Sequence, residues 1–71
     1  MNNHYRFERG SRYYEIFTLQ NLFGENDLVT VNGRIGSKLG RVRVQPLKHQ
    51  STEHLINTII HRRIKRGYIS I

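Results

Sequence analysis

Arginine and lysine are the side chains of this 71-residue sequence whose number and spacing suggest a chemical role. Lys and Arg total 12 against five Asp and Glu, for a formal net charge of +7. After Gly33 only Glu53 opposes nine basic residues, namely Arg34, Lys38, Arg41, Arg43, Lys48, Arg62, Arg63, Lys65 and Arg66. One-sided positive charge attracts phosphate backbones by Coulomb steering and counterion release. The distribution therefore favours a polyanionic partner; a basic surface that is merely solvated is the alternative.

Catalytic and metal chemistry have no comparable support in the sequence. The four histidines lie at positions 4, 49, 54 and 61, and His54 and His61 would be two helical turns apart, too far to share one metal ion. The carboxylates are few and scattered, and the glycines at 33, 36 and 40 lack the order of a phosphate-binding P-loop. The chain has no cysteine. We therefore expect no catalytic residues, no metal and no cofactor; a metal- or phosphate-dependent enzyme is the weakest alternative.

Two segments joined by a glycine-bounded loop read as paired strands, about 27–35 and 40–47. Each alternates apolar and polar residues with period two, the pattern of a half-buried strand. Val29, Val31, Val42 and Val44 are expected to face the core. The residues that would then face water together are Asn32, Arg34, Arg41 and Arg43, with Lys38 at the loop tip. This row is the first candidate surface for phosphate contacts.

A helix is predicted from about 51 to 66. Ser51 can cap its first turn, and Gly67 is a good left-handed stop. One apolar stripe would pack on the sheet, comprising Leu55, Ile56, Ile59, Ile60 and Ile64. The last turn forms the second candidate surface, with Arg62, Arg63, Lys65 and Arg66 beside Tyr68. Arginine offers a planar fork for phosphate oxygens, and tyrosine can stack on a base or sugar.

The remaining segments complete an α+β domain, a small antiparallel β-meander with one helix packed across it. Residues 12–20 read as a strand with apolar groups on both faces, so this strand is either central or covered on one face by the N-terminal arm. An uncovered apolar face would invite a second chain. Residues 1–11 read as a mobile lead-in outside a single domain at 12–71, although Tyr5 and Phe7 could form an edge strand. Residues 68–71 look like a short final strand.

The pattern Asn-Gly-Arg-Ile-Gly at 32–36, followed by Gly-Arg-Val-Arg-Val at 40–44, resembles the WGR domain. Arg-Tyr-Tyr-Glu-Ile at 12–16, the Leu-Phe-Gly turn at 22–24 and Lys-Arg-Gly-Tyr at 65–68 support the likeness. This module occurs in poly(ADP-ribose) polymerases and in small bacterial proteins. The resemblance implies a small antiparallel sheet wrapped on one helix, and DNA binding at strand breaks. Asn32 stands where the signature tryptophan would be, and Arg34 would be the motif arginine; polymerase activity is not implied.

The sequence therefore predicts a non-enzymatic nucleic-acid-binding module, for DNA more than RNA, with little sequence specificity. The residues expected to contact nucleic acid are Asn32, Arg34, Lys38, Arg41, Arg43, Arg62, Arg63, Lys65, Arg66 and Tyr68. The alternative is a protein-interaction module that docks an acidic partner or a second copy of itself. No apolar run approaches the ~20 residues of a membrane span, and residues 1–10 lack the apolar segment of a signal peptide. We expect a cytoplasmic protein without a membrane anchor.

Overall fold

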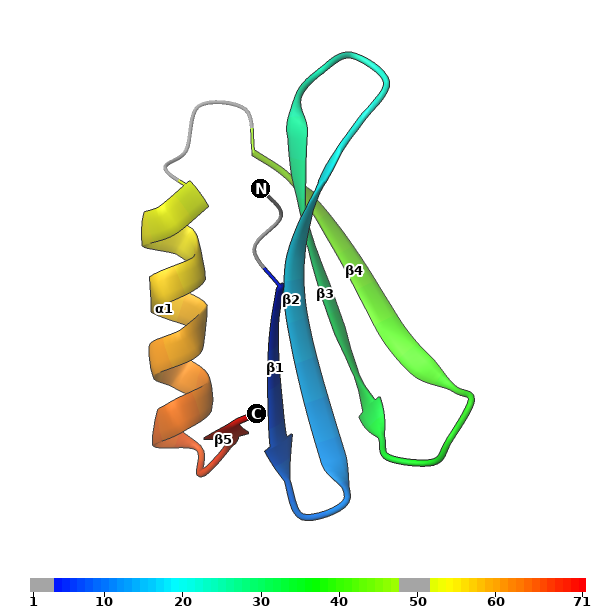
Figure 1. The fold of residues 1–71 in the computed structure, drawn as a ribbon, viewed down its shortest axis with the longest axis vertical. Coiled ribbons are helices and arrows are strands. Elements are labelled where there is room, and N and C mark those ends of the chain that lie inside the picture. Colours follow the sequence, from blue (N-terminus) through cyan, green and yellow to red (C-terminus); the bar gives the residue numbers. More distant parts are fainter. Residues whose placement is uncertain (1–3, 48–51) are drawn as a thin grey trace.

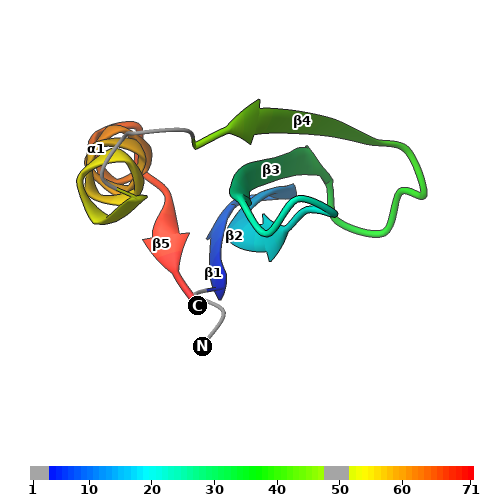
Figure 2. The same ribbon diagram turned by 90° about the horizontal axis from the view of Figure 1, so that it is seen from above.

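A computed structural model describes residues 4–47 and 52–71, which form one antiparallel sheet with a helix along one face (Figure 1). The elements in chain order are β1 (His4–Arg9), β2 (Arg12–Gln20), β3 (Asn26–Arg34), β4 (Gly40–Pro46), α1 (Thr52–Lys65) and β5 (Ile69–Ser70). The sheet order is β4-β3-β2-β1-β5. Figure 2 shows β5 beside α1 and β4 at the opposite edge of a curled sheet. The predicted α+β fold, an antiparallel meander with one helix, is confirmed.

Strand β1 differs from the prediction of a mobile lead-in over residues 1–11. It pairs with β2 along its whole length, from His4 opposite Phe17 to Arg9 opposite Arg12. Gly10, at φ +58°, opens the two-residue turn between these strands, as a type II′ hairpin requires. Phe7 is only 1% exposed, so β1 supplies core and belongs to the domain. As a result β2 lies inside the sheet, which is one of the two alternatives that the sequence left open.

The core lies between α1 and one side of the sheet, called here the inner face. Its buried members are Phe7, Tyr14, Ile16, Leu28, Leu47 and Ile56. Phe7 lies opposite Tyr14, and Ile16 lies opposite Thr30, so these side chains share a face by the alternation of a strand. Leu55, Ile59 and Ile60 pack against this cluster. Ile64, also predicted to be core, is 55% exposed, so the packed stripe ends one turn earlier.

The prediction that the valines face the helix-covered side was wrong for the β3–β4 pair, although Val29 is buried, at 5% exposed, on the opposite side. Asn32 lies opposite Tyr14, and Arg41 lies opposite Asn32, so the predicted polar row shares the inner face with the core. Val42 and Val44 point to the other side, the outer face, where they are 62% and 57% exposed. The large side chains of β1 and β2 bury more apolar surface than valines do, and their parity fixes which face the helix covers.

The end of α1 brings its basic last turn to the hairpin of β1 and β2. The Gly67 amide donates to the Ile64 carbonyl, and the Tyr68 amide donates to the Arg63 carbonyl. Together with the positive φ of Gly67, +91°, these two hydrogen bonds form a Schellman motif, which ends the helix at the predicted position. Ser51, the predicted cap, lies outside the described residues. The 14 residues of α1 are too few and too polar to cross a membrane, and no described helix could do so.

Candidate nucleic-acid interface

Three arginines from three neighbouring strands stand side by side at the lower end of the inner face. Arg9 of β1 is paired with Arg12 of β2, and Arg12 is paired with Arg34 of β3. Like charges directly opposite one another in a sheet destabilise it. This row therefore has a built-in electrostatic cost that a bound anion would relieve.

Helix α1 contributes a fourth arginine that is held in place by aromatic rings. The guanidinium carbon of Arg63 lies 4.2 Å from the centre of the Tyr14 ring and 5.6 Å from that of Tyr68. These are cation–π distances. Its Nε is buried and has no hydrogen-bond partner among the described residues. The two rings therefore pre-organise Arg63 at the edge of the sheet row.

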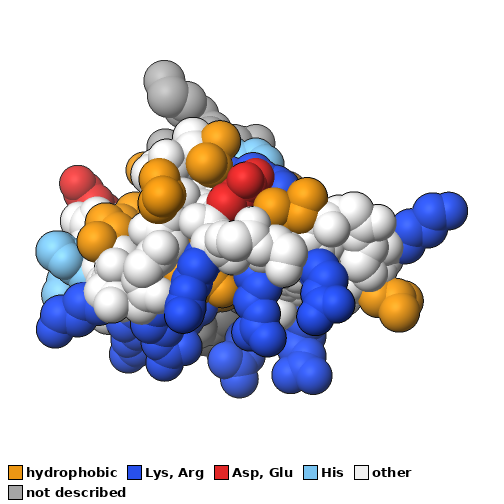
Figure 3. All heavy atoms as spheres, turned by 90° about the horizontal axis from the view of Figure 1, so that it is seen from below, with side chains coloured by type: hydrophobic (Ala, Val, Ile, Leu, Met, Phe, Trp, Pro, Cys, Tyr) orange, Lys and Arg blue, Asp and Glu red, His pale blue; other side chains and the backbone are white. Residues whose placement is uncertain are grey.

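The sheet row and the helix end enclose a cleft of about 400 Å³. We call it the arginine cleft; it is lined by Arg9, Arg12, Tyr13, Asn32, Gly33, Arg34, Arg63, Arg66 and Tyr68. No carboxylate, histidine, serine or cysteine lines it. Its guanidinium donors can hold an anion, and the hydroxyl groups in its lining are the phenols of Tyr13 and Tyr68. Seen from below, Lys and Arg side chains gather along one side of this end, apart from the acidic ones (Figure 3).

Gly33 lines the cleft with its backbone, and the side to which its Cβ would point is the outer face, where Tyr13 lies opposite it. A Cβ atom at this position would lie 3.1 Å from the ring and hydroxyl of Tyr13, which is tighter than an ordinary van der Waals contact. A glycine inside a strand leaves room for another side chain to approach the backbone closely. The Tyr13 ring occupies that space, and its hydroxyl oxygen would lie 2.9 Å from a Cβ atom at Gly40.

No family model, curated protein or solved structure matches this chain. The resemblance to the WGR domain therefore stays a prediction from the sequence. The function has to be inferred from the side chains of the cleft and from their charges.

The structure brings half of the predicted contact residues into the cleft: Asn32, Arg34, Arg63, Arg66 and Tyr68. Arg41 lines a neighbouring hollow of about 390 Å³ together with Leu39. Arg43, opposite Thr30, lies one step further along the inner face. Lys38 lies in the loop between β3 and β4. Arg62 and Lys65 are exposed on α1 and do not line the cleft.

Sequence reasoning missed Arg9 because it placed residues 1–11 outside the domain, and it missed Arg12 because the neighbours of the strand at 12–20 were left open. A signal for them was available in the stretch Arg-Gly-Ser-Arg at 9–12. A two-residue turn of Gly and Ser puts the flanking residues opposite each other. The alternating Tyr5, Phe7 and Arg9 would then have shown that both arginines share the inner face.

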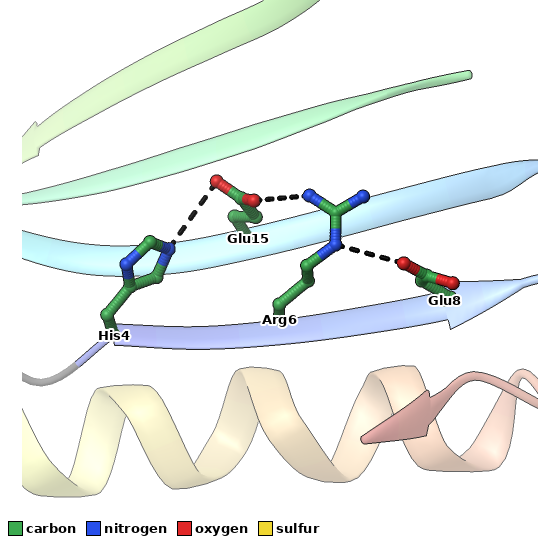
Figure 4. A network of polar contacts seen from close by, with 4 residues as sticks. All are labelled: His4, Arg6, Glu8 and Glu15. Carbon is green, nitrogen blue, oxygen red and sulfur yellow. Dashed lines mark hydrogen bonds and ion pairs between the residues drawn. The ribbon is translucent and has the colours of Figure 1, made fainter. Parts of the chain in front are cut away.

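The cations of the outer face differ from those of the cleft because they are paired. Arg6 donates hydrogen bonds to Glu15 and to Glu8, the latter at 3.0 Å, and His4 lies 3.4 Å from Glu15 (Figure 4). The bonds to Glu15 and then Glu8 raise the pKa of Arg6 above its ordinary value. Within residues 4–47 and 52–71, no arginine lining the cleft forms an ion pair. The positive charge of the cleft is therefore not neutralised by this part of the chain.

Metal ligation finds no support in the described part of the chain. No three His, Asp or Glu side chains there lie close enough together to hold a metal ion. His49 lies outside the described residues.

Proposed function

We propose that this chain is a nucleic-acid-binding module that holds the phosphate backbone in the arginine cleft. The observation that carries the proposal is the set of five arginines, Arg9, Arg12, Arg34, Arg63 and Arg66, around one hollow without a carboxylate. Guanidinium forks suit phosphate oxygens, and a phosphate would offset the repulsion within the strand row. The proposal contains no catalytic step.

The same lining supports weak sequence selectivity. Arginine and tyrosine side chains in the cleft suit phosphates and stacking, and contacts to phosphate position a protein without reading bases. Asn32 is the one side-chain amide in the lining. The resemblance to the WGR domain favours DNA over RNA, as a proposal that binding data have to test.

Direct titration tests the proposal. About 10 µM protein at ~50 mM salt should raise the fluorescence anisotropy of labelled duplex, nicked or single-stranded DNA, and the logarithm of the association constant should fall steeply with the logarithm of salt. A parallel titration with RNA tests the preference for DNA. Absence of a signal with all of these oligonucleotides would refute the proposal. Poly-glutamate that competes as well as DNA would instead favour an acidic protein partner.

A tryptophan at the position of the WGR signature gives an independent probe of the same site. The chain has four tyrosines but no tryptophan, so Asn32→Trp adds a single indole fluorophore at an exposed position in the lining of the cleft. We expect its emission to be quenched when an oligonucleotide binds, because an indole can stack on bases. Lys65→Trp, on the far side of α1, is the control and should respond little. Equal responses of both variants would place binding elsewhere.

A further inference from the structure

The outer face of β3 and β4 carries apolar side chains where a solvated sheet face is expected to be polar. Val42 and Val44 of β4 are 62% and 57% exposed, and Leu19 of β2 is 50% exposed. Val44 is paired with Val29, which is only 5% exposed, and Val42 with Val31, which is half-buried, so the valines form one apolar surface whose most exposed part is β4. An antiparallel sheet with one face on the core normally turns polar residues to water. In β3 and β4 the arginines lie on the inner face and the valines lie on the outer face, which is the reverse of that arrangement.

We infer that this outer apolar patch is the contact between two copies of the chain, packed sheet against sheet about a two-fold axis. A two-fold contact uses the same patch on both copies, and stacked sheets bury their facing side chains at a separation of ~10 Å. The patch consists of Leu19, Val31, Val42 and Val44, with Phe17 of β2 opposite Val29.

Charge favours a second copy as the occupant of this patch. The chain carries a formal charge of +7, so two copies repel each other wherever unpaired cations would meet. On the outer face Arg6 is held by Glu8 and Glu15, so this side brings no unpaired described arginine toward the partner. The same pairing leaves no free cation there for a polyanion. Packing by the outer face also turns both arginine clefts outward.

The dimensions of the chain set an upper limit on such a contact. The described chain extends 37 × 26 Å along its two longer axes, and a stable interface needs about 800 Å² from each partner. The exposed apolar residues cover only part of one face. We therefore expect a weak, concentration-dependent dimer.

Sedimentation velocity between about 10 µM and 1 mM protein tests the inference, in ~0.5 M NaCl to screen the net charge. Wild-type chain should shift from monomer to dimer across this range. Val42→Thr with Val44→Thr keeps the β-branched shape but replaces two methyl groups by hydroxyls, and should stay monomeric with an unchanged circular dichroism spectrum. A matched control is Leu22→Ser with Phe23→Ser, which removes two exposed apolar groups at the β2–β3 turn, outside the patch; it should dimerise like wild type.

Three results would overturn the inference. A wild-type monomer at ~1 mM excludes the contact, and a dimer unaffected by the valine changes excludes this patch. A dimer strengthened by Arg41→Gln with Arg43→Gln in the same salt would be joined at the free edges of β4, where these like charges would meet. The inference is independent of the proposed function: a chain that ignores nucleic acid can still dimerise, and the valine variant should bind a short oligonucleotide like wild type.

Discussion

Replacing Arg34 and Arg66 by glutamine should weaken oligonucleotide binding about 100-fold at low salt. Arg34 lines the arginine cleft from the end of β3, and Arg66, the residue that follows α1, lines it from the helix. A hydrogen bond to a charged group contributes at least ~1.5 kcal/mol, so losing two corresponds to roughly two factors of ten. Each lost phosphate contact should also lower the slope of log association constant against log salt by about one.

The control for this experiment removes the same charge from outside the cleft. Lys38→Gln with Lys65→Gln also lowers the net charge by two, but neither residue lines the cleft. Lys38 lies in the loop between β3 and β4, and the ~100° step per helical residue places Lys65 about 180° from the buried Ile56. We expect this variant to lose affinity only a few-fold, through the long-range field of the protein.

The comparison of the two double variants separates a defined site from general attraction. If binding depends on net charge alone, both should weaken binding equally and change the salt slope equally. Equal effects would refute the arginine cleft as the binding site even if the chain binds DNA tightly. A larger effect of the lysine pair would move the site to the outer surface of α1 and the β3–β4 loop.

The sequence predicted the elements better than it predicted their faces. Strand β2, helix α1 and the stop at Gly67 follow from local signals that no distant contact overrides. The side that β3 and β4 turn to the core could not be predicted in the same way. Valines alternate with polar residues equally regularly whichever side faces the core. Tyr14 and Ile16 decide it through the register of β2 with β3, and that register is a non-local property.

The arginine cleft was only half predictable for the same reason. The row Arg9, Arg12 and Arg34 exists because two strand pairings align three residues that are distant in sequence. Arg63 and Arg66 join it because the Schellman turn directs β5 back beside β1. The basic composition pointed to a phosphate partner, but only the assembled sheet shows which cations gather and which are neutralised by Glu8 and Glu15.

Phe7→Ala is the substitution from which we expect the largest loss of stability. Phe7 is 1% exposed in the core that joins β1 to α1, and truncating a buried phenylalanine costs about 3–5 kcal/mol. At ~0.05–0.15 kcal/mol per residue, a chain of this size has only about 4–11 kcal/mol of stability in total. The variant should therefore lose at least about a quarter of the free energy of unfolding, measured as a lower midpoint of urea denaturation followed by circular dichroism.

The same substitution at Phe23 provides the control for that measurement. Phe23 is 86% exposed at the β2–β3 turn, so Phe23→Ala should change the free energy of unfolding by less than about 0.5 kcal/mol. If Phe7→Ala is equally harmless, β1 is not part of the cooperative unit and residues 1–11 form the lead-in that the sequence suggested. That outcome would also affect the arginine cleft, because Arg9 ends β1 and is positioned only while β1 stays paired with β2. The stability of the first strand and the charge of the cleft are thus linked, and a destabilised β1 should weaken binding even with every arginine in place.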